Sequence, residues 1–174
     1  MDNTMKTIRF ILLCSILSAI AIPATLQAQP KIGSFGFGLI LGEPTGLTLK
    51  GSAGRANAWD LAVGSSWFGN LRIHGDYLWN VDAFNSNKAG LYFGLGAAVG
   101  IGRGKGVFIK GEKNKWYYYD DEDALALGIR GVAGLNAMPF SAPVEMFLEV
   151  APLIGISPVT GLGTDVAIGI RYYP

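Results

Sequence analysis

The chain has 174 residues, of which half are hydrophobic and only 16% are charged. Fourteen lysines and arginines stand against 13 aspartates and glutamates, and this near balance gives no reason to expect a nucleic-acid partner. Cys14 is the only cysteine and His74 the only histidine, which argues against disulfides, thiolate-bound zinc and a histidine-rich metal site. We therefore expect no metal and no cofactor.

The first 28 residues have the three parts of a secretory signal peptide. Two basic residues precede the apolar run Phe10–Ile22, Pro23 ends the run, and Ala28 offers a small residue for cleavage. The run has 13 residues, fewer than the roughly 20 that a transmembrane helix needs, which disfavours a retained anchor. These features predict a cleaved signal peptide over residues 1–28 and one exported domain over residues 29–174.

After residue 30, apolar residues alternate with small or charged ones at the period of a half-buried β-strand. Turn residues such as those of Gly42–Gly46 divide this region, because proline and glycine favour chain reversal. The pattern predicts eight strands: Ile32–Leu41, Leu47–Ser52, Ala58–Trp67, Leu71–Trp79, Gly90–Ile101, Asp123–Asn136, Val144–Leu153 and Asp165–Pro174. Successive strands of about 10 alternating residues are typical of a membrane barrel, and an even number places both ends on one side of the membrane.

Each predicted strand has one apolar face and one face of small and charged residues. The second face collects Lys50, Asp60, Arg72, His74, Asp76, Arg130, Glu145, Glu149, Asp165 and Arg171. In a soluble secreted ligand-binding barrel these charges would meet water, whereas an outer-membrane barrel would enclose them. The charged face also carries most of the strand glycines and alanines, as expected where eight strands converge and long charged side chains need room.

Aromatic residues near the strand ends of the apolar face fit belts at the two membrane interfaces. They are Trp59, Trp67, Tyr77, Trp79 and Tyr172. The enclosed charges include both signs and can pair, as buried charges must. The sequence thus predicts an all-β, eight-stranded, antiparallel up-and-down transmembrane β-barrel with an inward polar network. A soluble secreted ligand-binding barrel is the alternative, since it alternates as well.

The signal peptide, the strand pattern and the closing segment "GTDVAIGIRYY" resemble the small outer-membrane β-barrels of the OmpX and OmpA-transmembrane-domain type. "GLILGEPTGLTLK" and "HGDYLW" resemble small bacterial barrels of the same structural class. The resemblance implies residence in the outer membrane of a diderm bacterium, in contact with its lipid and lipopolysaccharide. It also implies recognition of the C-terminal strand by the barrel-assembly machinery. Such proteins usually end on an aromatic residue, whereas here Pro174 follows two tyrosines.

Some outer-membrane barrels modify lipids with serine and histidine, so a lipid-modifying barrel enzyme is a further alternative. His74 and Asp76 share the inward face, and Ser66 lies on the neighbouring predicted strand. Catalysis would need these groups at a membrane rim, whereas the pattern places His74 in mid-strand. We therefore expect no enzyme activity and assign His74 to the internal network.

The segment Gly102–Glu122 is the most individual part of the chain and predicts a hairpin that protrudes from the fifth and sixth strands. Its candidate surface-binding residues are Lys110, Lys113, Lys115, Trp116, Tyr117, Tyr118 and Tyr119. Exposed aromatics beside charges are common in binding surfaces, and lipopolysaccharide headgroups or an unknown extracellular partner are equally suitable targets. The expected role is structural or surface-interacting, with a filled lumen that is not a general pore.

Overall fold

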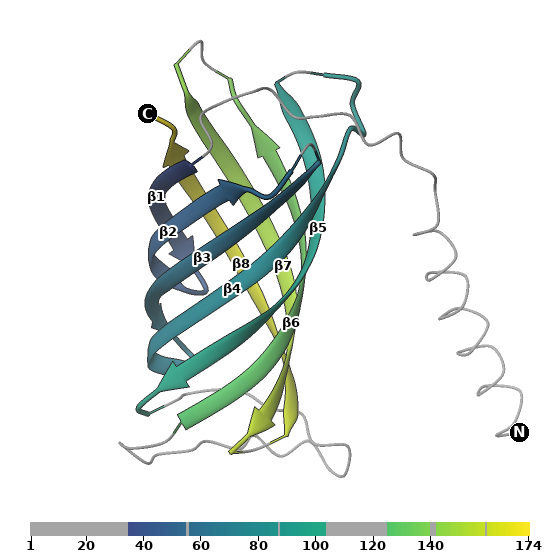
Figure 1. Cartoon of the computed structure of the whole chain (residues 1–174). Helices are drawn as coiled ribbons and strands as arrows, with labels where there is room; N and C mark the ends of the chain where they lie inside the picture. Colours follow the sequence, from purple (N-terminus) through teal and green to yellow (C-terminus); the bar gives the residue numbers. More distant parts are fainter. Residues whose placement is uncertain (1–34, 55, 87, 104–124, 140–141, 159) are drawn as a thin grey trace, which may run out of the picture.

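The computed structural model describes residues 35–54, 56–86, 88–103, 125–139, 142–158 and 160–174. These residues form eight antiparallel strands, each paired with its neighbours in the chain, and β1 pairs with β8 to close the barrel (Figure 1). The strands are β1 Phe35–Gly42, β2 Thr45–Ser52, β3 Asn57–Ser66, β4 Gly69–Val81, β5 Ala89–Ile101, β6 Leu125–Ala137, β7 Val144–Ser157 and β8 Gly161–Tyr172. The predicted all-β barrel of eight antiparallel strands is confirmed. In the described part of the chain there is no helix with the length and hydropathy to cross a membrane.

Except in the last hairpin, the described ends of the predicted strands agree with the structure to within about two residues. In that hairpin β7 extends to Ser157 and β8 begins at Gly161, so most of the segment predicted as a loop is paired strand. Pairs such as Ile154 with Leu162 continue the ladder because alternation persists through this segment. Residues 32–34 and 123–124, predicted to begin the first and sixth strands, lie outside the described residues.

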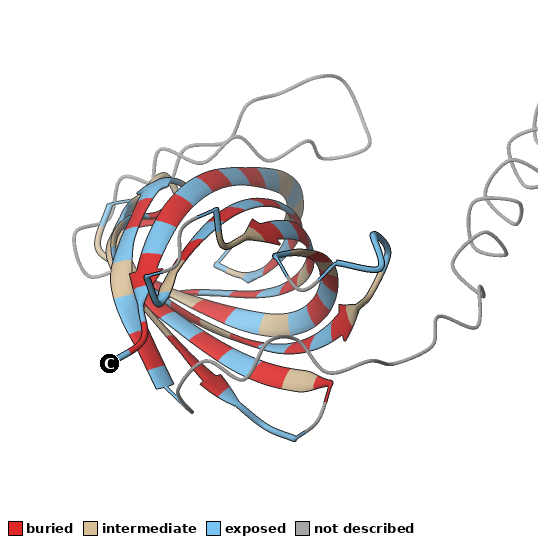
Figure 2. Ribbon diagram, turned by 90° about the horizontal axis from the view of Figure 1, so that it is seen from above, coloured by how far each residue is buried: buried red, intermediate tan, exposed pale blue. Residues whose placement is uncertain are grey.

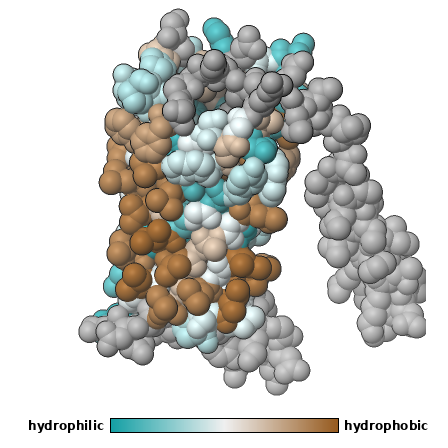
Figure 3. Space-filling model, viewed as in Figure 1, coloured by the Kyte–Doolittle hydropathy of each residue, from teal (hydrophilic) through white to brown (hydrophobic). Residues whose placement is uncertain are grey.

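Burial alternates residue by residue along the strands, as the bands in Figure 2 show. In β7, Glu145, Phe147 and Glu149 are buried while Met146 and Leu148 are exposed. The buried side chains fill the lumen, and the exposed leucines, isoleucines, valines and aromatics form the outer wall. Figure 3 shows these apolar side chains gathered over much of the face in view, with a paler strip between them. The core of this protein is therefore its lumen, and its apolar surface is its outside.

The exposed aromatic residues on the strands gather at one end of the barrel. We call this end, where β1 begins and β8 ends, the terminal rim, and the opposite end the hairpin rim. These residues are Phe35, Phe37, Trp59, Tyr77, Trp79, Phe93 and Tyr172. Several of their rings form close pairs, with centroids 5.3 Å apart for Tyr77–Trp79 and 6.1 Å apart for Phe37–Tyr172. They share this rim because they lie at the starts of β1, β3 and β5 and at the ends of β4 and β8.

The prediction of aromatic belts at both rims is therefore wrong for the described residues. The large hydrophobic residues exposed on the strands near the hairpin rim are aliphatic, and they include Leu41, Leu71, Ile101 and Leu125. Trp67, which the sequence placed on the apolar face, lies in the β3–β4 turn and packs against the buried Phe68. A register shift between Gly64 and Ser66 breaks the alternation there, so parity no longer predicts the direction of Trp67.

Candidate functional site: the charged lumen

All ten residues of the predicted polar network lie inside the barrel, and none is more than 4% exposed. They come from β2, β3, β4, β6, β7 and β8, so no two neighbouring strands could assemble the set alone. Closure of the sheet is what brings them together. Among the described residues, four buried bases face five buried acids, and His74 lies among them.

Near the hairpin rim, Arg72 and Asp165 form a bidentate ion pair across the lumen. The Nη1–Oδ1 and Nη2–Oδ2 distances are 3.0 and 2.6 Å. Arg72 also donates to the Ser66 hydroxyl, and its guanidinium lies 5.8 Å from the ring of Phe68. Phe68, fully buried in the β3–β4 turn, packs against Leu153 and two alanines. At this end of the lumen, the apolar cluster around Phe68 therefore packs beside the ion pair of Arg72 and Asp165.

Near the terminal rim, Glu145 gathers three donors. Lys50 lies 2.8 Å from its Oε1, the Asn136 amide donates at 3.2 Å, and the Tyr173 hydroxyl donates to its Oε2. Tyr173 follows β8, and burial together with the adjacent Glu145 carboxylate raises the pKa of its phenol. The phenol therefore stays protonated and remains a donor to this carboxylate.

In the middle of the lumen, Arg171 is enclosed on several sides. It donates to the Thr48 hydroxyl at 2.9 and 3.1 Å and to Asp60 at 3.3 Å, and its guanidinium stacks 3.8 Å from the Phe147 ring centroid. Glu149 lies 3.8 Å from Arg171 and accepts a hydrogen bond from Tyr92 at 2.7 Å. These contacts fill the section of the barrel between the two end clusters.

Arg130 lies among three carboxylates without a short contact to any of them. Its nitrogens are 3.5 Å from Asp76, 3.8 Å from Glu149 and 3.9 Å from Asp165. It thereby connects Asp165, the partner of Arg72, to Glu149, which lies beside Arg171. The network consequently runs without a break from one rim of the barrel to the other.

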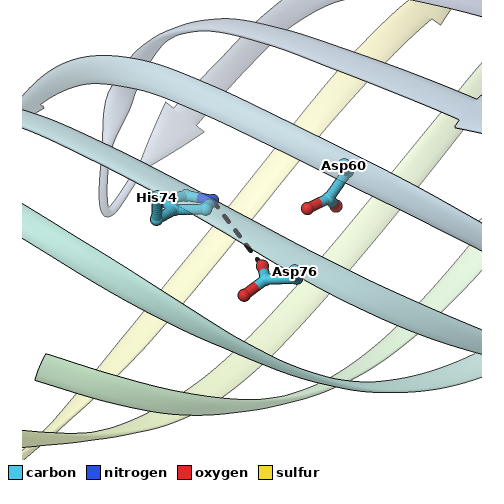
Figure 4. Close-up of side chains that lie close together, drawn as sticks. All are labelled: Asp60, His74 and Asp76. Atoms are coloured by element: carbon cyan, nitrogen blue, oxygen red, sulfur yellow. Dashed lines mark ion pairs between the residues drawn. The ribbon is translucent and has the colours of Figure 1, made fainter.

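Asp60, His74 and Asp76 form a compact cluster on the adjoining strands β3 and β4 (Figure 4). Asp60 and Asp76 are direct partners in the β3–β4 register, and His74 Nε2 lies 3.8 Å from Asp76 Oδ2. One ligand atom of each side chain lies within 4.8 Å of those of the other two. The sequence placed all three on the inward face, but their proximity depends on the β3–β4 register, which alternation does not reveal.

Several residues of the lumen network were not predicted from the sequence, although most of them occupy inward-facing positions on their strands. Tyr92, Thr48 and Asn136 are neutral and occupy inward strand positions, so parity alone could have found them. Phe68 had no such signal, because it belongs to a turn after a register shift. Glycines provide the space: a Cβ on Gly134 would lie 2.1 Å from the Tyr92 ring.

The structure does not bring Ser66 and His74 together. His74 is opposite Ala62 in the β3–β4 register, four residues before Ser66 and therefore roughly 13 Å away along the strand. Ser66 instead accepts hydrogen bonds from Arg72 and from the backbone of Phe68. The seven candidate surface-binding residues, Lys110 to Tyr119, lie outside the described residues. No protein-family model, curated protein or solved structure matches the chain.

Proposed function

We propose that the protein is an integral outer-membrane β-barrel of a diderm bacterium, exported by a cleaved signal peptide over residues 1–28. Its role is structural or surface-interacting, and its filled lumen is not a general pore. The observation that carries the proposal is the distribution of polarity in a closed barrel. The wall is apolar on the outside, with Leu95 64% exposed, while Arg72, Glu145 and Arg171 are at most 1% exposed inside.

This distribution fits lipid better than water. Soluble monomers rarely expose contiguous apolar patches larger than about 300–600 Å². Here every strand of the barrel has exposed leucine, isoleucine or valine residues, and some strands have exposed aromatic residues as well. In a bilayer this wall meets hydrocarbon, and the closed ladder leaves no unpaired strand edge. A soluble ligand-binding barrel would instead need an apolar interior, and the inner face carries the charges.

The same distribution supports a lumen that is filled. An eight-stranded barrel is just wide enough for its inward side chains. Those side chains include Tyr92, Phe147 and three arginines, and they are joined by cross-lumen contacts. The geometry of Ser66 and His74 gives no support to a lipid-modifying enzyme, so we propose no catalytic role.

The aromatic belt supports a position for the barrel in the membrane, and the orientation follows from the proposed class. Tryptophan and tyrosine favour the interface between hydrocarbon and headgroups, so the terminal rim lies at one membrane surface. In the outer-membrane class both termini face the periplasm. The end of β5 and the start of β6, at the hairpin rim, then face the outer side. The candidate surface-binding residues, among them Lys110, Lys113 and Trp116, belong to the sequence between these two strands. Lipopolysaccharide headgroups or an extracellular partner are their proposed contacts, and the barrel-assembly machinery is the proposed partner of β8.

The test is cell fractionation followed by electrophoresis with and without boiling. We expect the protein in the outer-membrane fraction after an alkaline wash, and a faster band in the unboiled sample because a closed barrel resists the detergent. A soluble periplasmic protein with no heat-dependent shift would contradict the proposal. Deletion of residues 2–28 serves as the matched control, since it should abolish export.

A further inference from the structure

We propose that Asp60, His74 and Asp76 form a binding site for one divalent transition-metal ion inside the lumen. The three side chains project from β3 and β4 toward a common point (Figure 4), and the site depends on the barrel interior alone. The inference therefore does not require that the outer wall faces lipid.

The spacing of the ligand atoms is close to that around a metal ion. Bonds from zinc to imidazole nitrogen and carboxylate oxygen are about 2.0–2.2 Å long, so two ligand atoms of one tetrahedral ion lie roughly 3.3–3.6 Å apart. His74 Nε2 and Asp76 Oδ2 are 3.8 Å apart, just beyond this range. The three ligand atoms lie within 4.8 Å of one another, so the widest pair must approach by up to roughly 1.2 Å to bind one ion. Rotation of the carboxylates and of the imidazole can supply a shift of this size.

Polar atoms of the cluster are buried without hydrogen-bond partners. They are Asp60 Oδ1, His74 Nδ1 and both carboxylate oxygens of Asp76. These residues are only 2–4% exposed. A buried carboxylate without hydrogen bonds is costly, because it has lost its water without a replacement. A metal ion would satisfy these oxygens.

The surrounding charges hold the two aspartates but leave ligand atoms available. Arg171 binds Asp60 through Oδ2, and Arg130 lies 3.5 Å from Asp76 Oδ1. Both arginines thus lie where the outer partners of metal-binding carboxylates commonly lie, and they fix the orientation of the ligands.

The ligand types select the class of metal. One imidazole nitrogen with two carboxylate oxygens suits Zn²⁺, Mn²⁺, Fe²⁺ or Co²⁺, whereas Mg²⁺ and Ca²⁺ prefer sites made of oxygen alone. Three protein ligands leave room for water or another lumen group in the remaining position. Because the cluster is buried on all sides, the ion would enter while the barrel folds. Once bound, it would cross-link β3 and β4 in the middle of the wall.

The experiment measures metal uptake during folding. Untagged protein is unfolded with urea and a chelator, refolded into detergent with a slight excess of Zn²⁺, and separated from free metal. We expect about one Zn²⁺ per barrel by mass spectrometry of the metal content. His74→Gln and Asp76→Asn should each lower the bound zinc at least about tenfold, because each removes one of three ligands. Asp82→Asn makes the same charge change outside the strands and should leave the zinc content unchanged.

The wild-type protein gives a second measurement that needs no variant. Refolding with Co²⁺ should produce the visible absorption of a tetrahedral nitrogen-and-oxygen site, and excess Zn²⁺ should remove it. Zinc should also raise the melting temperature of the refolded barrel, whereas Mg²⁺ should not. A wild-type barrel that retains no zinc would overturn the proposal and leave a proton shared by Asp60 and Asp76 as the alternative. Zinc that persists in folded His74→Gln would overturn it as well.

Discussion

Arg72 and Asp165 form a bidentate ion pair across the full width of the barrel, although 93 positions separate them in the chain. Arg72 lies on β4 and Asp165 on β8, and the closed order of strands places these two on opposite walls. Both side chains are at most 2% exposed. The pair thus links opposite walls of the barrel, and it can form only after β1 has paired with β8.

Removal of one partner of this pair should destabilise the barrel strongly. Arg72→Ala or Asp165→Ala leaves a buried charge uncompensated, and we expect the free energy of unfolding to fall by about 3–5 kcal/mol. Urea unfolding in detergent, followed by tryptophan fluorescence, measures the change. Lys88→Ala removes an exposed base on the β4–β5 loop and should change the free energy by about 0.5 kcal/mol or less.

The double variant tests whether the two residues act on each other. Because the second substitution removes the charge that the first had stranded, Arg72→Ala with Asp165→Ala should cost less than the sum of the single changes. Strictly additive costs would show that the ion pair does not stabilise the protein as described.

Arg130→Ala and Glu149→Ala should lower the melting temperature far more than Lys113→Ala or Asp121→Ala. The first two remove buried members of the cross-lumen network, in which Arg130 lies near three carboxylates. The last two change the segment predicted to protrude from the barrel. Differential scanning calorimetry compares the four variants, and equal shifts would mean that the inward assignment of the charges is wrong.

The two glycines Gly131 and Gly134 of β6 provide a matched pair for the packing of the lumen. A Cβ at Gly134 would lie 2.1 Å from the Tyr92 ring, whereas the nearest atom to a Cβ at Gly131 is 3.8 Å away. Gly134→Ala should displace Tyr92 from its hydrogen bond with Glu149 and cost about 1–3 kcal/mol. Gly131→Ala should cost less than about 0.5 kcal/mol. Equal costs, measured by urea unfolding, would show that the Tyr92 ring does not fill this space.

Alternation predicted which side chains share a face, because a β-strand has a period of two and one face is apolar throughout. This is why Lys50, Glu149 and Arg171 were assigned together, although they lie on three different strands. The partners within the lumen could not be predicted. The choice of Asp165 as the partner of Arg72 depends on closure and on the height of each residue along the barrel axis, and neither appears in a local pattern.

The predictions from the sequence are wrong where the two-residue period of a strand is interrupted. They are also wrong where the outcome depends on the position of a residue along the barrel axis. Trp67 follows a register shift, so its parity says nothing about its direction. The single aromatic belt arises because Trp59 and Tyr77, on antiparallel strands, are direct partners at one rim. The opposition of Asp60 and Asp76 has the same origin, since it follows from the length of the β3–β4 turn.

The filled lumen should prevent steady conductance. Tyr92, Phe147 and Arg171 occupy its middle section, and Phe68 caps the hairpin rim. Protein reconstituted in planar bilayers should therefore give no reproducible open level above the bare membrane. Stable openings of the size typical of general-diffusion porins would contradict the packing described here.

A dye attached to the outer wall can measure whether this wall contacts lipid or water. In a Cys14→Ser background, Leu95→Cys places one thiol at the middle of β5, on a side chain that is 64% exposed. An environment-sensitive dye on this thiol, in protein reconstituted into liposomes, should emit at short wavelength and be quenched by lipids with brominated acyl chains. The same dye at Ser86→Cys, on the exposed β4–β5 loop, should instead be quenched by aqueous iodide. Quenching of the Leu95→Cys dye by iodide and not by brominated lipid would show that the outer wall faces water and not lipid.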